Sequence, residues 1–149
     1  LLIAFVSCKA RAPQPGDELA GVTQFVANGS FEEMDGERQK GWTTRKWQRE
    51  SDAVFAVEPS GHTGGRSVTI SSEKGADASW IAAVPIKPYS RYRLSGWIRT
   101  ENLVPGVSRG AQLNINGEGE WRTPPVTGTQ DWTQVEVEFD AGANDALTP

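Results

Sequence analysis

Apolar and polar residues alternate with a period of two along two stretches of this chain, residues 91–100 and 132–140. The apolar positions that share one face are Tyr92, Leu94, Ile98, Val135, Val137 and Phe139. A period of two is typical of β-strands with one face in the core and one toward solvent. The pattern therefore predicts two amphipathic strands that contribute their apolar faces to one core.

Shorter segments of the same kind are separated by turns rich in Gly, Pro, Asn and Asp. We expect further strands at 22–27, 41–48, 53–57, 66–72, 79–87 and 111–116. No stretch carries a convincing helical pattern. Many short strands with no helices indicate an all-β fold, a β-sandwich or jelly roll whose two inner faces form the core.

The beginning of the chain has a different pattern. Residues 1–7 are uncharged and almost wholly apolar, and the only cysteine, Cys8, follows them. The run is too short to span a bilayer, and it resembles the end of a bacterial lipoprotein signal peptide with Cys8 as the lipidated residue. The alternative is an ordinary buried strand followed by an inert thiol.

We therefore expect three parts: the end of a signal peptide at 1–8, a Pro-rich tether at 9–21 and one domain at 22–149. The protein would then be lipid-anchored outside the cytoplasm, at the cell surface, in the periplasm or extracellularly. No turn or strand is predicted after Asp140, so we expect the sandwich to lack its final strand through truncation.

Composition narrows the range of partners. With 149 residues, 37% hydrophobic residues and six Trp, the chain can bury the core of one domain. The net charge is −4 and the basic residues are scattered, which argues against nucleic acid as a partner. The membrane would be contacted only through the lipid anchor, and we expect a monomer.

Trp97 is the strongest candidate for a ligand contact, because it stands on the polar face of the strand at 91–100. The alternative is that a loop packs over it. Gln112 and Asn114 share the polar face of the segment 111–116, and amides both donate and accept hydrogen bonds, as sugar hydroxyls require. A Trp ring offers the flat apolar surface that suits a pyranose.

Trp47 and Trp121 are flanked by arginines and are either exposed ligand platforms or partners of those guanidinium groups. The three remaining tryptophans, Trp42, Trp80 and Trp132, are better explained as core or turn-packing residues. The basic residues Arg45, Lys46 and Arg49 are typical of a solvated strand face, and the sequence assigns them no function.

A catalytic site is not indicated. Glu118 and Glu120 flank Gly119, and two nearby carboxylates can hydrolyse glycosides, but this sequence is typical of a solvated loop tip. His62, the only histidine, has no nucleophile or acidic partner in a recognisable motif.

Five motifs occur together in one order: N-G-S-F-E-E at 28–33, G-W at 41–42, S-G-H-T-G-G-R-S-V at 60–68, I-K-P-Y-S-R-Y-R-L-S-G-W at 86–97 and G-T-Q-D-W-T at 128–133. In this set the chain resembles the CenC-like carbohydrate-binding modules of families 4, 9 and 22. The resemblance implies a galactose-binding-like jelly roll whose ligand-facing sheet includes the strands of Trp97 and of Gln112 and Asn114.

The resemblance also implies a structural calcium ion at the edge of the sandwich. Its ligands would be the carboxylate of Glu32, with Glu33 as the alternative, and the backbone oxygens of His62 and Arg66. Oxygen ligands from several loops suit this hard cation.

The leading hypothesis is non-catalytic binding of a polysaccharide or oligosaccharide by an exported bacterial protein. The alternative is a structural spacer or protein-interaction module, which would bury Trp97 or cover it with a loop. A hydrolase domain beyond Pro149 is a third hypothesis, and it would leave the role of this domain unchanged.

Overall fold

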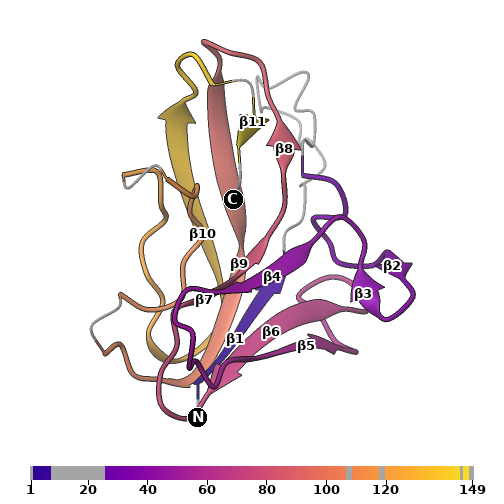
Figure 1. The fold of residues 1–149 in the computed structure, drawn as a ribbon, viewed down its shortest axis with the longest axis vertical. Coiled ribbons are helices and arrows are strands. Elements are labelled where there is room, and N and C mark those ends of the chain that lie inside the picture. The colour runs from indigo at the N-terminus through magenta and orange to yellow at the C-terminus, as the bar shows by residue number, and fades with distance from the viewer. Residues whose placement is uncertain (1, 8–25, 107–108, 118–119, 145, 148–149) are drawn as a thin grey trace.

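The computed structural model describes residues 2–7, 26–106, 109–117, 120–144 and 146–147, and for residues 2–7 the backbone alone (Figure 1). Every paired strand in it is antiparallel. The described residues include no helix, and thus none long and apolar enough to cross a membrane.

The larger layer is a five-stranded sheet with the order β10-β9-β1-β6-β5. Its strands are β1 (Leu2–Ser7), β5 (Val54–Glu58), β6 (Ser67–Ser72), β9 (Arg91–Leu103) and β10 (Gly128–Asp140). The two longest strands are β9 and β10, which the period-two pattern predicted. Their pairing runs from Arg91 opposite Asp140 to Leu103 opposite Gly128, with two register shifts near Gln130.

Three two-stranded pairs accompany this sheet. β4 (Thr43–Lys46) pairs with β7 (Ala78–Ile81), β8 (Val84–Pro85) with β11 (Ala146–Leu147), and β2 (Met34–Asp35) with β3 (Arg38–Gln39). Figure 1 shows the β4–β7 pair crossing in front of the sheet. Contacts confirm that it is a second layer, since Trp80 of β7 packs edge-on against Phe55 of β5 at 5.7 Å between ring centroids.

The core lies between β9, β10 and the segment 111–126. One buried cluster contains Leu94, Ile115 and Phe139, and the other contains Ile98, Val126 and Val135. The segment 111–126 folds back on itself through two isolated bridges, Ala111 with Val126 and Asn114 with Arg122. The predicted inward faces of both long strands are therefore confirmed.

The fold class is confirmed as all-β, and the strand boundaries differ in detail. The expected strand at 79–87 is interrupted at residues 82–83, so that it forms β7 and β8. The segment 111–116 makes bridges but no regular strand. Val26 and Ala27 lie in a bend and a turn, and the rest of the expected first strand lies outside the described residues.

The structure forms a strand near each end of the sequence, β1 and β11. Leu2–Ser7 forms β1, which pairs with β6 on one side and β9 on the other, as the ordinary-strand alternative requires. The expectation that no turn or strand follows Asp140 was wrong. Ala141 donates its N–H to Ser90 O at 2.9 Å, the chain turns, and β11 pairs with β8.

Candidate functional site

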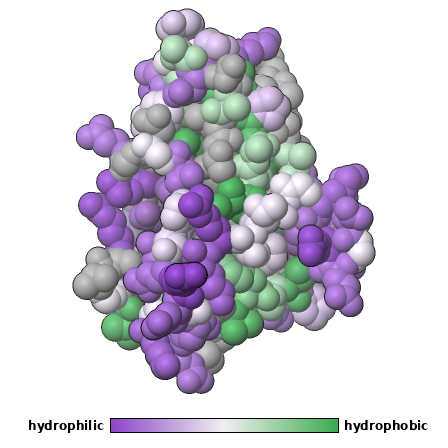
Figure 2. Space-filling view, in the orientation of Figure 1, coloured by the Kyte–Doolittle hydropathy of each residue, from purple (hydrophilic) through white to green (hydrophobic). Residues whose placement is uncertain are grey.

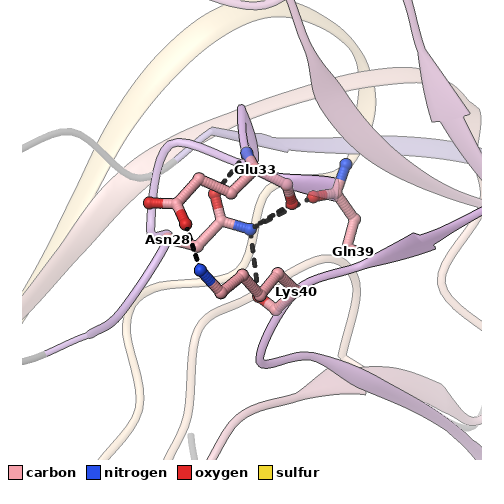
Figure 3. Close-up of polar contacts among 4 residues, drawn as sticks. All are labelled: Asn28, Glu33, Gln39 and Lys40. Carbon is pink, nitrogen blue, oxygen red and sulfur yellow. Dashed lines mark hydrogen bonds and ion pairs between the residues drawn. The ribbon is translucent and has the colours of Figure 1, made fainter. Parts of the chain in front are cut away.

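Asn28 organises the turn that carries Glu32 and Glu33 (Figure 3). Its side-chain Nδ2 donates to Glu33 O at 2.8 Å, to Lys40 O at 3.0 Å and to Gln39 Oε1 at 3.3 Å. Its Oδ1 accepts the N–H of Glu33 at 2.9 Å. The backbone of Asn28 has a φ of 51°, in the left-handed region that Asn tolerates better than most residues. One side chain thus fixes the direction in which the next residues leave the turn.

Glu32 reaches the loop between β5 and β6. Its Oε1 accepts the N–H of Arg66 at 3.1 Å, and its main-chain oxygen accepts a bond from Arg66 Nη1 at 3.1 Å. A Cβ on Gly64 would lie 2.0 Å from Oε1, so the carboxylate packs directly on the loop backbone. Glu33 points elsewhere and pairs with Lys40 at 2.8 Å.

Glu32 lies beside Arg66, as the calcium prediction requires, and the two residues are joined by a hydrogen bond and an ion pair. The Arg66 guanidinium lies 3.9 Å from Glu32 Oε2, so a positive charge of the protein already faces the carboxylate. In the part of the chain that the structure describes, no group of three or more His, Cys, Asp or Glu side chains could hold a metal. The predicted ligands also include the main-chain oxygens of His62 and Arg66, which do not depend on a cluster of side chains, so calcium binding stays a prediction.

Trp97 lies beneath the same loop. The His62 ring stacks on its indole with 3.8 Å between centroids and an interplanar angle of 12°. The Trp132 ring meets His62 edge-on at 5.8 Å, and the Arg99 guanidinium lies 5.6 Å from the Trp132 centroid. One face of Trp97 is therefore occupied by a residue of the protein, and the half-buried indole belongs to an aromatic cluster on the outer face of the large sheet.

Gln112 and Asn114 lie on the other side of the domain. Leu113 packs against both core clusters, so its neighbours in the extended segment 111–115 point away from the large sheet. Trp97 points away from the core in the opposite direction, because Leu94 and Ile98 on its strand face inward. The structure therefore does not bring Trp97 together with Gln112 and Asn114. Gln112 Oε1 is buried and has no hydrogen-bond partner among the described residues.

Trp47 follows β4 on the outer side of the second layer. Trp80, which pairs with Thr44, faces the core, so the alternate positions Arg45, Trp47 and Ser79 face outward. Trp47 is 40% exposed, its Nε1 donates to Ser79 Oγ at 3.4 Å, and the Arg45 guanidinium lies 3.8 Å from the ring centroid. Trp47 thus points outward from the β4–β7 pair, whereas Gln112 and Asn114 point outward from the segment 111–126.

The other tryptophans are occupied by packing. Trp121 stacks on Phe139 with 4.7 Å between centroids and joins the first core cluster. Trp42 packs on Phe31 at 4.7 Å and donates its Nε1 hydrogen to Asn28 O. Trp80 donates to Thr69 O at 3.1 Å. Trp121 therefore packs in the core, whereas part of the Trp47 ring is exposed to solvent.

Both ring contacts correspond to alternatives that the sequence left open. A loop over Trp97 was one of them, but His62 was not expected as its partner, because the path of the loop at 59–66 has no periodic signal. The Arg45–Trp47 contact is the guanidinium alternative for Trp47, and residues two apart in a strand share a face. Glu118 and Cys8 lie outside the described residues.

The antiparallel two-layer fold and its surface aromatic and amide side chains define a β-sandwich-like binding module. The family model of a carbohydrate binding domain, which represents families 4 and 9, matches residues 23–148. The chain therefore belongs to this carbohydrate binding domain family, as the five motifs indicated. A comparison with curated proteins gives no match.

Proposed function

We propose that this protein binds a polysaccharide or oligosaccharide without catalysing a reaction on it, and that Trp47 provides the main sugar contact. The proposal rests on one observation: a Trp that is 40% exposed stands on the outer face of a domain from a carbohydrate binding family. Gln112 and Asn114, which lie on the segment 111–126 on the opposite side of the core from Trp97, are the proposed polar contacts.

The chemistry of such a site follows from its side chains. The apolar face of a sugar ring packs on an indole, which adds about 0.5–1.5 kcal/mol to the gain from area burial. The Asn114 amide can then fix the orientation of the ring, because it can donate to one hydroxyl and accept from another, whereas Gln112, whose Oε1 is buried, offers its amino group. A few contacts of this kind give dissociation constants of about millimolar to micromolar.

Affinity gel electrophoresis against a panel of plant, algal and bacterial polysaccharides tests the proposal. One polysaccharide should retard the parent, and Trp47→Ala should weaken that binding by about tenfold or more, which corresponds to 1.4 kcal/mol. Val104→Ala is the matched control, since Val104 is 82% exposed and apolar. Unchanged retardation of a folded Trp47→Ala variant would refute the site.

Trp97 separates this proposal from the spacer alternative. The stacking of His62 on Trp97 is the covering that a spacer module would have, and it favours that alternative for the large sheet. In the same assay Trp97→Ala should leave binding unchanged if Trp47 carries the site. A folded protein that no polysaccharide retards would favour the spacer or protein-interaction function.

We also propose export, a tether at 9–21 and a lipid anchor at Cys8, on the strength of the apolar run and its cysteine. Such processing would remove the residues that form β1. Deletion of residues 1–8 decides between the two roles, because loss of β1 would leave β6 and β9 with unpaired edges. Unchanged stability favours a signal segment, and a large loss favours a structural strand.

Calcium stays a separate prediction. Calorimetric titration of the EDTA-treated protein with CaCl₂ tests it, with Glu32→Gln as the variant that removes the only carboxylate shown facing the loop at 60–66. Calcium binding by the parent that is lost in Glu32→Gln would support the predicted site, and no binding by the parent would refute it. Size-exclusion chromatography tests the expected monomer.

A further inference from the structure

The Arg45 guanidinium lies over the exposed ring of Trp47. Its guanidinium carbon lies 3.8 Å from the centroid of the indole ring, within the range of a cation–π contact. A stacked guanidinium keeps its N–H groups available in the plane of the group, and it loses less side-chain freedom when it binds a ligand. The contact therefore holds a positive charge beside Trp47, the proposed sugar contact.

No acidic group of the described residues neutralises this cation. The ion pairs found among these described residues use other basic side chains, namely Lys40, Arg66, Arg91 and Arg93. Asp77 lies beside β4, but it contacts Trp47 through its main-chain oxygen, which accepts the Trp47 N–H at 2.9 Å.

The basic residues Lys46 and Arg49, which follow Arg45, also form no ion pair with an acidic side chain of the described residues. Lys46 Nζ donates to the main-chain oxygen of Ser51 at 3.1 Å, and Arg49 is exposed. Glu50 is the acidic residue next to them in sequence, and it forms no ion pair with them in the part of the chain that the structure describes. Figure 2 shows strongly hydrophilic residues gathered at the lower left of this view. The chain carries −4 overall, yet Arg45, Lys46 and Arg49 place three positive charges within five residues.

We infer that the ligand of this site is an anionic polysaccharide, whose sugars carry a carboxylate or sulfate group. The inference rests on the proposed function and adds the class of ligand. A charged sugar joins an apolar ring face to a planar or forked set of oxygen acceptors. The Trp47 ring can pack on the apolar face of the sugar, and two parallel N–H groups of Arg45 can donate to the oxygens of its carboxylate or sulfate. A neutral sugar would leave the guanidinium without a charged partner.

Paired polymers with the same backbone test the inference. Polygalacturonate is compared with its fully methyl-esterified form, and dextran sulfate with dextran, so that carboxylate and sulfate are distinguished. The parent should be retarded by at least one charged polymer and by neither neutral counterpart. Retardation should also decrease between about 50 and 300 mM NaCl, because salt screens exposed charges.

Variants of Arg45 then identify the contact. Arg45→Gln should weaken binding of the charged polymer about tenfold, since a charge-assisted bond contributes about 1.5–3 kcal/mol. Arg45→Lys keeps the charge but loses the fork, so its binding should be intermediate. Arg38→Gln is the control, because it removes an exposed Arg charge on β3.

The possible results separate this inference from the proposed function. Equal binding of neutral and charged polymers, or an Arg45→Gln variant that binds like the parent, overturns the inference and leaves carbohydrate binding intact. Retardation by no polymer of either kind overturns both.

Discussion

Replacing Asn28 by Ala should destabilise the protein more than any other change of a partly exposed polar residue described above. The side chain makes four hydrogen bonds, three as donor and one as acceptor, and they join the turn at 28–33 to residues 39 and 40. Ala cannot replace any of them. It must also adopt the φ of 51° that Asn28 has.

The expected loss is about 4 kcal/mol. The bonds to the main chain of Glu33 and Lys40 are exposed, and water replaces them at a cost of about 0.5 kcal/mol each. Gln39 is 2% exposed, and its Oε1 would be left without this donor, which costs about 1–2 kcal/mol. The left-handed backbone adds about 1 kcal/mol for Ala.

Urea unfolding followed by tryptophan fluorescence measures this loss. Asn28→Gly should recover about 1 kcal/mol of it, because Gly adopts positive φ without penalty. Asn116→Ala is the matched control, since Asn116 is exposed and also precedes a Gly; it should change stability by less than about 0.5 kcal/mol. An Asn28→Ala variant within that margin of the parent would refute the role assigned to the turn.

Three further predictions concern stability. Gly61→Ala should cost about 2 kcal/mol or more, because its Cβ would lie 2.3 Å from Arg66 O, whereas Gly106→Ala, with nothing within 4 Å, should be neutral in the same urea assay. Trp121→Ala should cost about 3 kcal/mol through loss of its packing on Phe139, and Trp47→Ala less than about 1 kcal/mol. The Ser72 hydroxyl and then the N–H groups of Lys74 and Glu73 lower the pKa of Asp52 from its ordinary value of 3.8. The stabilisation by the Asp52 carboxylate is therefore complete above its ordinary pKa of 3.8 and is lost as the pH falls through the lowered pKa. The difference in unfolding free energy between the parent and Asp52→Asn should therefore shrink below about pH 4. A difference that grows on acidification would contradict this origin.

The sequence predicted the core better than the site, and the two long strands show why. Along β9 and β10 every second residue meets the same environment, so burial of Leu94, Ile98, Val135 and Phe139 follows from spacing alone. Alternation also predicted a strand at 111–116, but this segment makes only two bridges. Its apolar residues face the core without a continuous ladder, because inward orientation requires only an extended backbone.

The site depends on loops, whose paths no periodicity encodes. Spacing placed Trp97 on the outer face of its strand, but only the folded loop shows that His62 covers it. Spacing likewise could not show that Gln112 and Asn114 point away from Trp97 across the core. Contact of Trp47 with a flanking arginine was one of the two alternatives predicted, and Arg45 and Trp47 are neighbours on one strand face.

Where residues 1–8 stay in the chain, the place of β1 has a consequence for how the protein folds. Residues 2–6 pair with residues 68–72, and residues 3–7 pair with 97–101, so the middle of the sheet is built from contacts between distant parts of the chain. Such contacts require large loops to close before any hydrogen bond forms. Folding should therefore take milliseconds to seconds rather than microseconds, and the central strand should be ordered late.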